Sequence, residues 1–410
     1  MDNFLDVLGD FSFDEIDVSG ELENFSSFNF DAYGDTSGGT EGDDYILNYS
    51  DEVKILALGG DDTIENVGSY VYIDGGTESD QIINTDGVGR GSFVFINGGD
   101  GNDTIQNGTD NNDGGDNVTI TGGAGNDYIE NNHYHDESAS NSANALISGG
   151  EGDDTIINRN APDATLIGSA GNDSIYNDGG DNALIGGGDG DDSIRNYGEN
   201  GTIEAGASND FIHNYSNGFN SYLSGGDGAD TIENDAQHVI IDAGVDNDHI
   251  ANAGSNATIL ADAGDDFIAN SGDNGSIVGG AGDDFIHNYS NGFNSYLGGG
   301  DGADTIENDA QNVIIDAEVG NDHIANAGSN AVINAGKGND TIFLDTDAQN
   351  NVIQYTAGDG NDLIQGFNET STLEIGGDTG TYSTQVSGED LIVTVGEGSI
   401  TLKGAASLEK

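Results

Sequence analysis

The 410-residue sequence has no cysteine and no tryptophan, one proline, one methionine and only seven Lys or Arg residues. Without cysteine there is no disulfide framework and no thiolate-ligated zinc site. Seven scattered basic residues make no nucleic-acid-binding footprint. No apolar run reaches the roughly 18 residues that a membrane span requires, and an anionic membrane surface would repel the chain. We therefore expect no nucleic acid partner and no membrane insertion.

The charge is strongly one-sided, with 76 acidic residues, a formal net charge of -69 and 68 glycines. Such a balance usually predicts disorder, because charge repulsion opposes collapse when little apolar surface can be buried. The alternative is that a cation which the sequence does not encode neutralises the acidic groups. Met1–Gly20 is itself acidic and carries no basic region, so no Sec-type signal peptide is expected there.

Internal periodicity favours the second possibility. A pattern of the form Gly-Gly-x-Gly-x-Asp-x-Ile-x-Asn recurs seventeen times, and eight of the sixteen spacings between successive Asp residues are 18 residues. We call these Asp residues the anchor aspartates. They are Asp44, Asp62, Asp80, Asp103, Asp127, Asp154, Asp173, Asp192, Asp210, Asp230, Asp248, Asp266, Asp284, Asp304, Asp322, Asp340 and Asp362.

Isoleucine follows every anchor two positions later, and Ile or Leu precedes fifteen of the seventeen anchors by seven positions. One branched aliphatic residue about every nine positions does not form the apolar stripe of an amphipathic helix. It is typical of very short strands that alternate with glycine-rich turns. The sequence therefore predicts an all-β fold, a parallel β-roll or β-solenoid of about 17 turns whose stacked turns bury a thin column of Ile and Leu.

The glycine-aspartate turns offer backbone carbonyls and a carboxylate, and calcium prefers such oxygen ligands. Segments such as 98–105 and 122–129 resemble the nonapeptide of RTX (repeats-in-toxin) proteins, and the resemblance covers about four fifths of the chain. It implies a β-roll with a column of Ca²⁺ ions between successive turns, held by backbone carbonyls and by all seventeen anchors. Glycines that match the motif are Gly98, Gly101, Gly122, Gly125, Gly149, Gly152, Gly225, Gly228, Gly279 and Gly282.

Metal-free Gly-Asp turns are the alternative, but they would leave a column of like charges about 4.8 Å apart. Some turns depart from the motif: Asp80, Asp210 and Asp248 lack the fourth-position glycine, and Asp62 and Asp322 lack the leading pair. We expect those sites to bind calcium weakly or not at all.

The other edge of each turn lacks the nonapeptide, so we expect metal on one edge only. Asn stands four residues after fifteen of the anchors, from Asn48 to Asn326. Stacked amides can hydrogen-bond along a ladder, although Asn is also simply tolerated in turns. The second edge is therefore predicted to be either an amide column or a row of ordinary turns.

The chain divides into three expected parts. Residues 1–38 hold six of the fifteen phenylalanines and no repeat, and we interpret them as a cap or as a segment that docks on another copy and builds a homo-polymer through the solenoid ends. Residues 39–345 form the calcium-binding solenoid. Residues 346–410 hold the last repeat and a small antiparallel β cap, which by the RTX resemblance could include a signal for type I secretion.

No His-Glu-x-x-His and no Gly-x-Ser-x-Gly motif occurs, and the repeats begin too early to leave room for a catalytic domain, so we expect no enzyme. His133 and His135 suggest a solvated loop rather than a metal site. The function indicated is a secreted, calcium-binding structural or adhesive solenoid of a matrix, surface layer or filament. Alternatives are a carbohydrate- or ice-binding module, for which Tyr215, Tyr289, Phe219 and Phe293 are candidates, and a non-catalytic segment of a larger toxin or enzyme.

Overall fold

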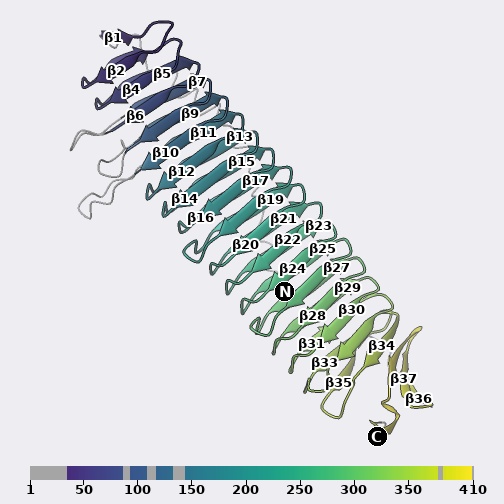
Figure 1. Ribbon diagram of the computed structural model, residues 1–410. Helices are drawn as coiled ribbons and strands as arrows, with labels where there is room; N and C mark the ends of the chain where they lie inside the picture. Colours follow the sequence, from purple (N-terminus) through teal and green to yellow (C-terminus); the bar gives the residue numbers. More distant parts are fainter. Residues whose placement is uncertain (1–34, 86–92, 109–116, 133–143, 377–381, 409–410) are drawn as a thin grey trace.

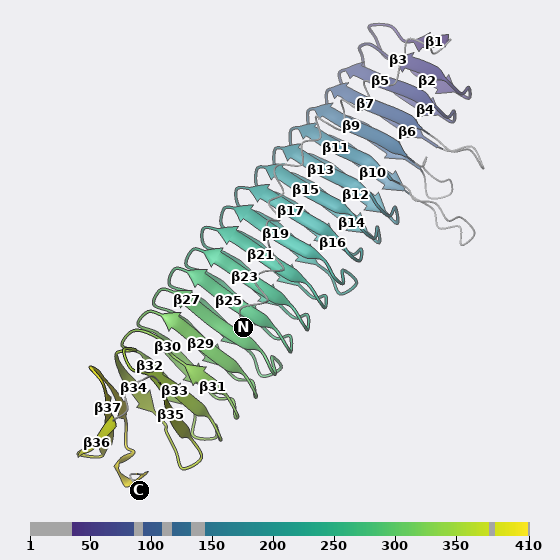
Figure 2. The same ribbon diagram turned by 180° about the vertical axis from the view of Figure 1, so that it is seen from behind.

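The computed structural model describes residues 35–85, 93–108, 117–132, 144–376 and 382–408. Within these ranges the chain contains no α-helix, and its short 3-10 helix η3 is Ala406–Leu408. Strands alternate between two parallel sheets, one strand of each sheet per turn, and the turns stack into a long rod (Figures 1 and 2). No helix in this part of the chain is long and apolar enough to cross a membrane.

Sheet A contains eighteen strands, all odd-numbered up to β35. They are β1 (Asp35–Gly38), β3 (Val53–Leu56), β5 (Val71–Thr77), β7 (Val94–Asp100), β9 (Val118–Ala124), β11 (Leu146–Glu151), β13 (Thr165–Ala170), β15 (Leu184–Asp189), β17 (Thr202–Ala207), β19 (Tyr222–Asp227), β21 (Ile240–Val245), β23 (Thr258–Ala263), β25 (Ser276–Ala281), β27 (Tyr296–Asp301), β29 (Ile314–Val319), β31 (Val332–Asn334), β33 (Val352–Thr356) and β35 (Thr372–Gly376).

Sheet B contains the even-numbered strands that follow the anchor aspartates, together with three strands at its C-terminal end. They are β2 (Tyr45–Asn48), β4 (Thr63–Asn66), β6 (Gln81–Asn84), β8 (Thr104–Asn107), β10 (Tyr128–Asn132), β12 (Thr155–Arg159), β14 (Ser174–Asp178), β16 (Ser193–Asn196), β18 (Phe211–Asn214), β20 (Thr231–Asn234), β22 (His249–Asn252), β24 (Phe267–Asn270), β26 (Phe285–Asn288), β28 (Thr305–Asn308), β30 (His323–Asn326), β32 (Thr341–Leu344), β34 (Asn361–Gln365), β36 (Tyr382–Ser387), β37 (Asp390–Val395) and β38 (Gly398–Leu402).

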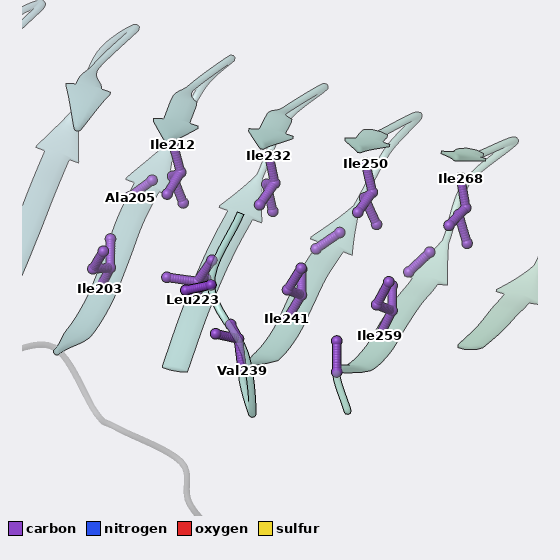
Figure 3. Close-up of a cluster of buried hydrophobic side chains, with 14 of the residues drawn as sticks. Ile203, Ala205, Ile212, Leu223, Ile232, Val239, Ile241, Ile250, Ile259 and Ile268 are labelled. Carbon is purple, nitrogen blue, oxygen red and sulfur yellow. The ribbon is translucent and has the colours of Figure 1, made fainter. Parts of the chain in front are cut away.

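The repeats pair in strict register, so equivalent side chains stack from turn to turn. Ile105 of β8 lies beside Ile129 of β10, and Ile96 of β7 lies beside Ile120 of β9. Alternate residues of each short strand point inward, as the period of two in a β-strand requires. The inward Ile, Leu and Ala side chains form one continuous buried column between the sheets (Figure 3).

The predicted fold class is confirmed: the chain is an all-β parallel solenoid. Seventeen turns at about 4.8 Å each give a rod on the order of 80 Å long. The first strand, β1 (Asp35–Gly38), lies within the segment 1–38 that the sequence suggested as a cap. It pairs in parallel with β3 and so belongs to sheet A of the solenoid. The rest of that segment, residues 1–34, lies outside the described residues.

The C-terminal end is closed by antiparallel strands, as the sequence predicted. β36 pairs antiparallel with β37, and β37 pairs antiparallel with β38. Two strands of the expected cap are instead parallel continuations of the solenoid: β38 pairs with β34, and β35 pairs with β33. Their backbones take the place that the next turn would occupy on each sheet.

Candidate metal-binding edge

Every anchor from Asp44 to Asp340 directly precedes a strand of sheet B, Asp362 lies within β34, and a short turn brings the chain to each anchor from sheet A. This turn needs left-handed backbone, which Gly99 (φ 118°) and Gly101 (φ 142°) adopt without a steric penalty. Where the motif is degenerate the same conformation is retained, for example at Glu78 (φ 70°) and Ser208 (φ 88°). The turn therefore does not depend on a complete glycine set.

The anchor carboxylates form a one-directional hydrogen-bond ladder. The backbone N–H of Asp103 donates to Oδ1 of Asp127 in the next turn at 2.7 Å. The same bond joins all sixteen successive pairs from Asp44 to Asp362, at 2.7–3.1 Å. One oxygen of each carboxylate is thereby fixed in place.

The second oxygen, Oδ2, is buried without a hydrogen-bond partner in fifteen turns. An unpaired carboxylate oxygen away from water is expensive, so native proteins pair such groups or bind a cation there. These anchors are at most 3% exposed. They are Asp62, Asp80, Asp103, Asp127, Asp154, Asp173, Asp192, Asp210, Asp230, Asp248, Asp266, Asp284, Asp304, Asp322 and Asp340.

The first anchor is an exception that the sequence did not reveal. Oδ2 of Asp44 accepts hydrogen bonds from the backbone N–H and from the hydroxyl of Thr40. At the N-terminal end of the column, Thr40 thus pairs with the Oδ2 atom. In fifteen of the turns that follow, the equivalent Oδ2 atom has no partner.

Burial is the main reason why the anchor carboxylates resist ionisation. Together with the charges of neighbouring anchors, it raises the pKa of Asp127 to about 7 and that of Asp210 to about 8. The backbone hydrogen bond to Oδ1 acts in the opposite direction and lowers each pKa. Without a cation, the column is therefore poorly suited to carry full negative charge at neutral pH.

Backbone carbonyls lie close to the unpaired oxygens. Oδ2 of Asp103 and the carbonyl oxygen of Gly122, one turn on, both crowd the position that a β-carbon would take on Gly98. The two oxygens are consequently less than about 5 Å apart, a gap that one Ca²⁺ with bonds of about 2.3–2.6 Å can bridge. The oxygen-only donor set fits calcium.

Side chains alone do not make the site. Within the described ranges, no group of three or more His, Cys, Asp or Glu side chains is placed to hold a metal ion. Any ion on this edge would thus take most of its ligands from backbone carbonyls, as the RTX resemblance implies. Five of the ten expected glycines stand beside the Oδ2 atom of their own turn: Gly98, Gly122, Gly149, Gly225 and Gly279. The other five lie against a backbone carbonyl of the preceding turn instead: Gly101, Gly125, Gly152, Gly228 and Gly282.

The residue five positions before the anchor divides the turns into two kinds. Among the fifteen turns with an unpaired Oδ2, it is glycine in nine, at residues 75, 98, 122, 149, 168, 187, 225, 279 and 299, where Oδ2 lies against the glycine Cα. It is a buried alanine in six turns, at Ala57, Ala205, Ala243, Ala261, Ala317 and Ala335. There a methyl group takes up the space beside the carboxylate.

The opposite edge is an amide column, which confirms the first of the two interpretations drawn from the sequence. Nδ2 of Asn252 donates to Oδ1 of Asn270 at 2.7 Å and to the backbone carbonyl of Gly254 at 2.9 Å. The same side-chain bond joins all fifteen asparagines from Asn48 to Asn326, at 2.6–3.0 Å. The stacked amides of this column therefore satisfy one another.

A second, exposed amide row on this edge was not predicted. Nδ2 of Asn200 donates to Asn182, and Nδ2 of Asn294 donates to Asn274. These residues adopt left-handed backbone, for example Asn200 at φ 56°. The recurrence of Asn shortly before many strands of sheet A, such as β17 and β27, was the available signal.

The outer face of sheet B carries His213, His249, His287 and His323 and several aromatic residues. His213 lies between Glu233 and Asp235 at 3.3 and 3.2 Å, and His287 repeats this arrangement with Glu307 and Asp309. The Tyr215 ring stacks on the Tyr197 ring, whereas Phe219 packs against the core. Tyr289 and Phe293 are exposed. His133 and His135 lie outside the described residues.

No protein-family model and no curated protein matches the sequence. A solved Ca²⁺-dependent, β-helical antifreeze protein from an Antarctic bacterium is 20% identical, with a TM-score of 0.31 over 80% of this chain and 84% of that one. The extracellular lipase LipA from Serratia marcescens is 16% identical, with a TM-score of 0.23 over 70% of this chain and 42% of that one. Similarities of this size define no family. The chain's own coordinates define its class, a parallel β-solenoid with a column of buried aspartates.

Proposed function

We propose that this chain is a calcium-binding structural solenoid that becomes ordered when Ca²⁺ occupies the anchor edge. One observation carries the proposal: fifteen buried Oδ2 atoms without a hydrogen-bond partner follow one another along a single edge. The chain has only seven basic residues with which to neutralise them. The missing partner is therefore a cation from solution.

The donor set favours Ca²⁺ over other cations. Carboxylate and carbonyl oxygens at flexible distances suit Ca²⁺, whereas Mg²⁺ requires a smaller, near-octahedral site and retains its waters. Zn²⁺ and copper prefer nitrogen and sulfur ligands, and this edge offers oxygen alone. The resemblance to RTX nonapeptides supports the same choice.

Binding and folding should be coupled. Before the turns stack, the ligands of one ion belong to separate parts of a flexible, highly charged chain, so binding energy becomes folding energy. Extracellular calcium modules bind at about 10⁻⁴–10⁻³ M, far above cytosolic calcium. The chain would stay unfolded inside a cell, cross a type I secretion channel unfolded, and become ordered outside as a non-catalytic part of a matrix or surface layer.

Calcium titration tests this function directly. We expect a coil-like far-UV circular dichroism spectrum in chelator and a β spectrum on adding millimolar CaCl₂, with several ions bound per chain by calorimetry. MgCl₂ at the same concentration is the matched control and should leave most of the chain unfolded. A fully β spectrum in chelator at pH 8 would overturn the proposal.

A further inference from the structure

The two sheets do not end together at the C-terminal end of the rod. Sheet A stops at β35, which pairs with β33 and with no other described strand. Sheet B continues past β34 through β38, β37 and β36. Figures 1 and 2 show β36 and β37 at this end, opposite to β1. Sheet B therefore extends beyond sheet A by the strands β37 and β36, and we call the uncovered end formed by β35, β36 and β37 the step.

The step leaves apolar side chains uncovered. Tyr382 and Val386 of β36 are paired with Val395 and Leu391 of β37, so they belong to the inward face of the sheet. Val395 and Leu391 are buried, but Tyr382 is 64% exposed and Val386 is 43% exposed. Beyond β35, the next position of sheet A faces β37, and the position after it faces β36.

The exposed strand β36 of the step lacks charge, whereas β35 carries the exposed Glu374. In a chain with 76 acidic residues, β36 reads Tyr-Ser-Thr-Gln-Val-Ser and carries none. Native proteins commonly protect an edge strand with charge or proline, and β36 has neither. The free edge of β35 and the face of β36 together suit an uncharged, apolar strand.

The sequence contains an uncharged segment of suitable length near its other end. Residues 24–30 read Asn-Phe-Ser-Ser-Phe-Asn-Phe and carry no charge, although acidic residues flank them. Residues 24–30 cannot reach β35 of their own chain. Four residues, 31–34, separate position 30 from β1, and the five steps of chain span at most about 18 Å, whereas the rod is on the order of 80 Å long.

We propose that residues 24–30 of a second copy of this chain add to the free edge of β35 and cover Tyr382 and Val386. The added segment extends sheet A by one strand opposite β37, next to the inward face of β36. It brings the N-terminal end of one rod to the C-terminal end of another. The two contact surfaces differ, so the contact is heterologous and does not close on itself. Repeated addition yields a head-to-tail filament.

Electrostatics makes this contact dependent on solution conditions. Two chains of formal charge -69 repel each other, so uncharged strands are the suitable place for contact. Added salt shortens the range of that repulsion. Filaments should therefore lengthen as NaCl rises at fixed, saturating calcium.

Two complementary full-length variants test the contact. Val386→Asp places a charge on the docking face, and replacing Phe25, Phe28 and Phe30 by Ser weakens the added strand. By sedimentation velocity with saturating calcium, the wild-type chain should form concentration-dependent polymers, and each variant alone should be monomeric. Mixed together, the two variants should form one-to-one dimers and nothing larger, because only one productive contact remains.

Gln385→Asp is the matched control. It adds the same charge as Val386→Asp, but on the opposite face of the same strand. It should polymerise like the wild type. Tyr382→Asp changes a second residue of the docking face and should also be monomeric, which guards against the possibility that Val386→Asp acts only by disturbing the cap. A wild-type chain that remains monomeric in calcium, or a Val386→Asp chain that still polymerises, would refute the docking site. Calcium binding is measured on the wild type and on the same variants. In the wild type, normal calcium binding without polymers refutes the docking site alone, whereas loss of calcium binding refutes the proposed function.

Discussion

The backbone N–H of Asp153 donates to Oδ1 of Asn126 at 3.0 Å in an exposed row that runs beside the buried anchor ladder. The next residue, Asp154, belongs to the anchor column, where its Oδ1 accepts from Asp127 and its Oδ2 has no partner. Two adjacent aspartates thus differ in burial and in the satisfaction of their oxygens.

This pair provides a matched test of the metal edge. Asp154→Asn keeps an oxygen for the hydrogen bond from Asp127 but removes the charge that an ion would need. We expect calorimetry to show one or two fewer calcium ions per chain, and circular dichroism to show a higher calcium midpoint. Asp153→Asn changes the same charge at an exposed position and should leave both values close to wild type. Equal effects of the two substitutions would argue against the buried column as the binding edge.

Glycine or alanine beside the carboxylate should set calcium affinity. Gly122→Ala adds a methyl group where Oδ2 of Asp127 crowds the glycine Cα. We expect it to raise the calcium midpoint for folding. Ala205→Gly makes the opposite change beside Asp210 and should lower that midpoint. If both substitutions shift the midpoint in the same direction, the two kinds of turn do not differ in metal binding.

The calcium-free chain should be more ordered in mild acid than at alkaline pH. Burial raises the folded-state pKa of Asp103 to about 6 and that of Asp322 to about 7, above the usual value of about 3.9. Between about pH 4 and pH 7 the folded state therefore holds more protons than the unfolded state, and its stability falls as pH rises.

Circular dichroism in chelator at several pH values checks this dependence. We expect more β structure at pH 5 than at pH 8, and the difference should disappear in saturating calcium. Greater order at pH 8 without calcium would contradict the assignment of raised pKa values to the anchors.

The buried amide column should contribute to stability independently of metal. Asn252→Ala removes hydrogen bonds to Asn234, Asn270 and Gly254 and leaves buried partners unsatisfied. Loss of such a group costs about 1–3 kcal/mol. Thermal unfolding in saturating calcium measures the loss, and Asn274→Ala in the exposed row is the control with a smaller expected effect. If Asn252→Ala binds the same number of calcium ions as the wild type, its loss of stability comes from the amide edge and not from the metal edge.

The solenoid could be predicted from sequence because its signal repeats. Ile two residues after each anchor and Asn four residues after it mark, turn after turn, the buried column and the amide ladder. Thr40 could not be predicted, since a single residue at one end of an array leaves no periodic trace. The C-terminal step could not be predicted either, because it depends on which sheet the last strands join: β38 joins sheet B in parallel although its sequence alternates like an antiparallel strand.

The two edges also tolerate change differently. The turn into the anchor keeps its length throughout, whereas the spacing between successive anchors grows from 18 to as many as 27 residues in the segment between a sheet B strand and the following sheet A strand. Described turns of 18 and 20 residues keep the same inward register. Foreign peptides inserted between a sheet B strand and the following sheet A strand should be carried on the side of an otherwise unchanged rod. The amide edge therefore offers a display scaffold with inserts spaced about 4.8 Å apart per turn.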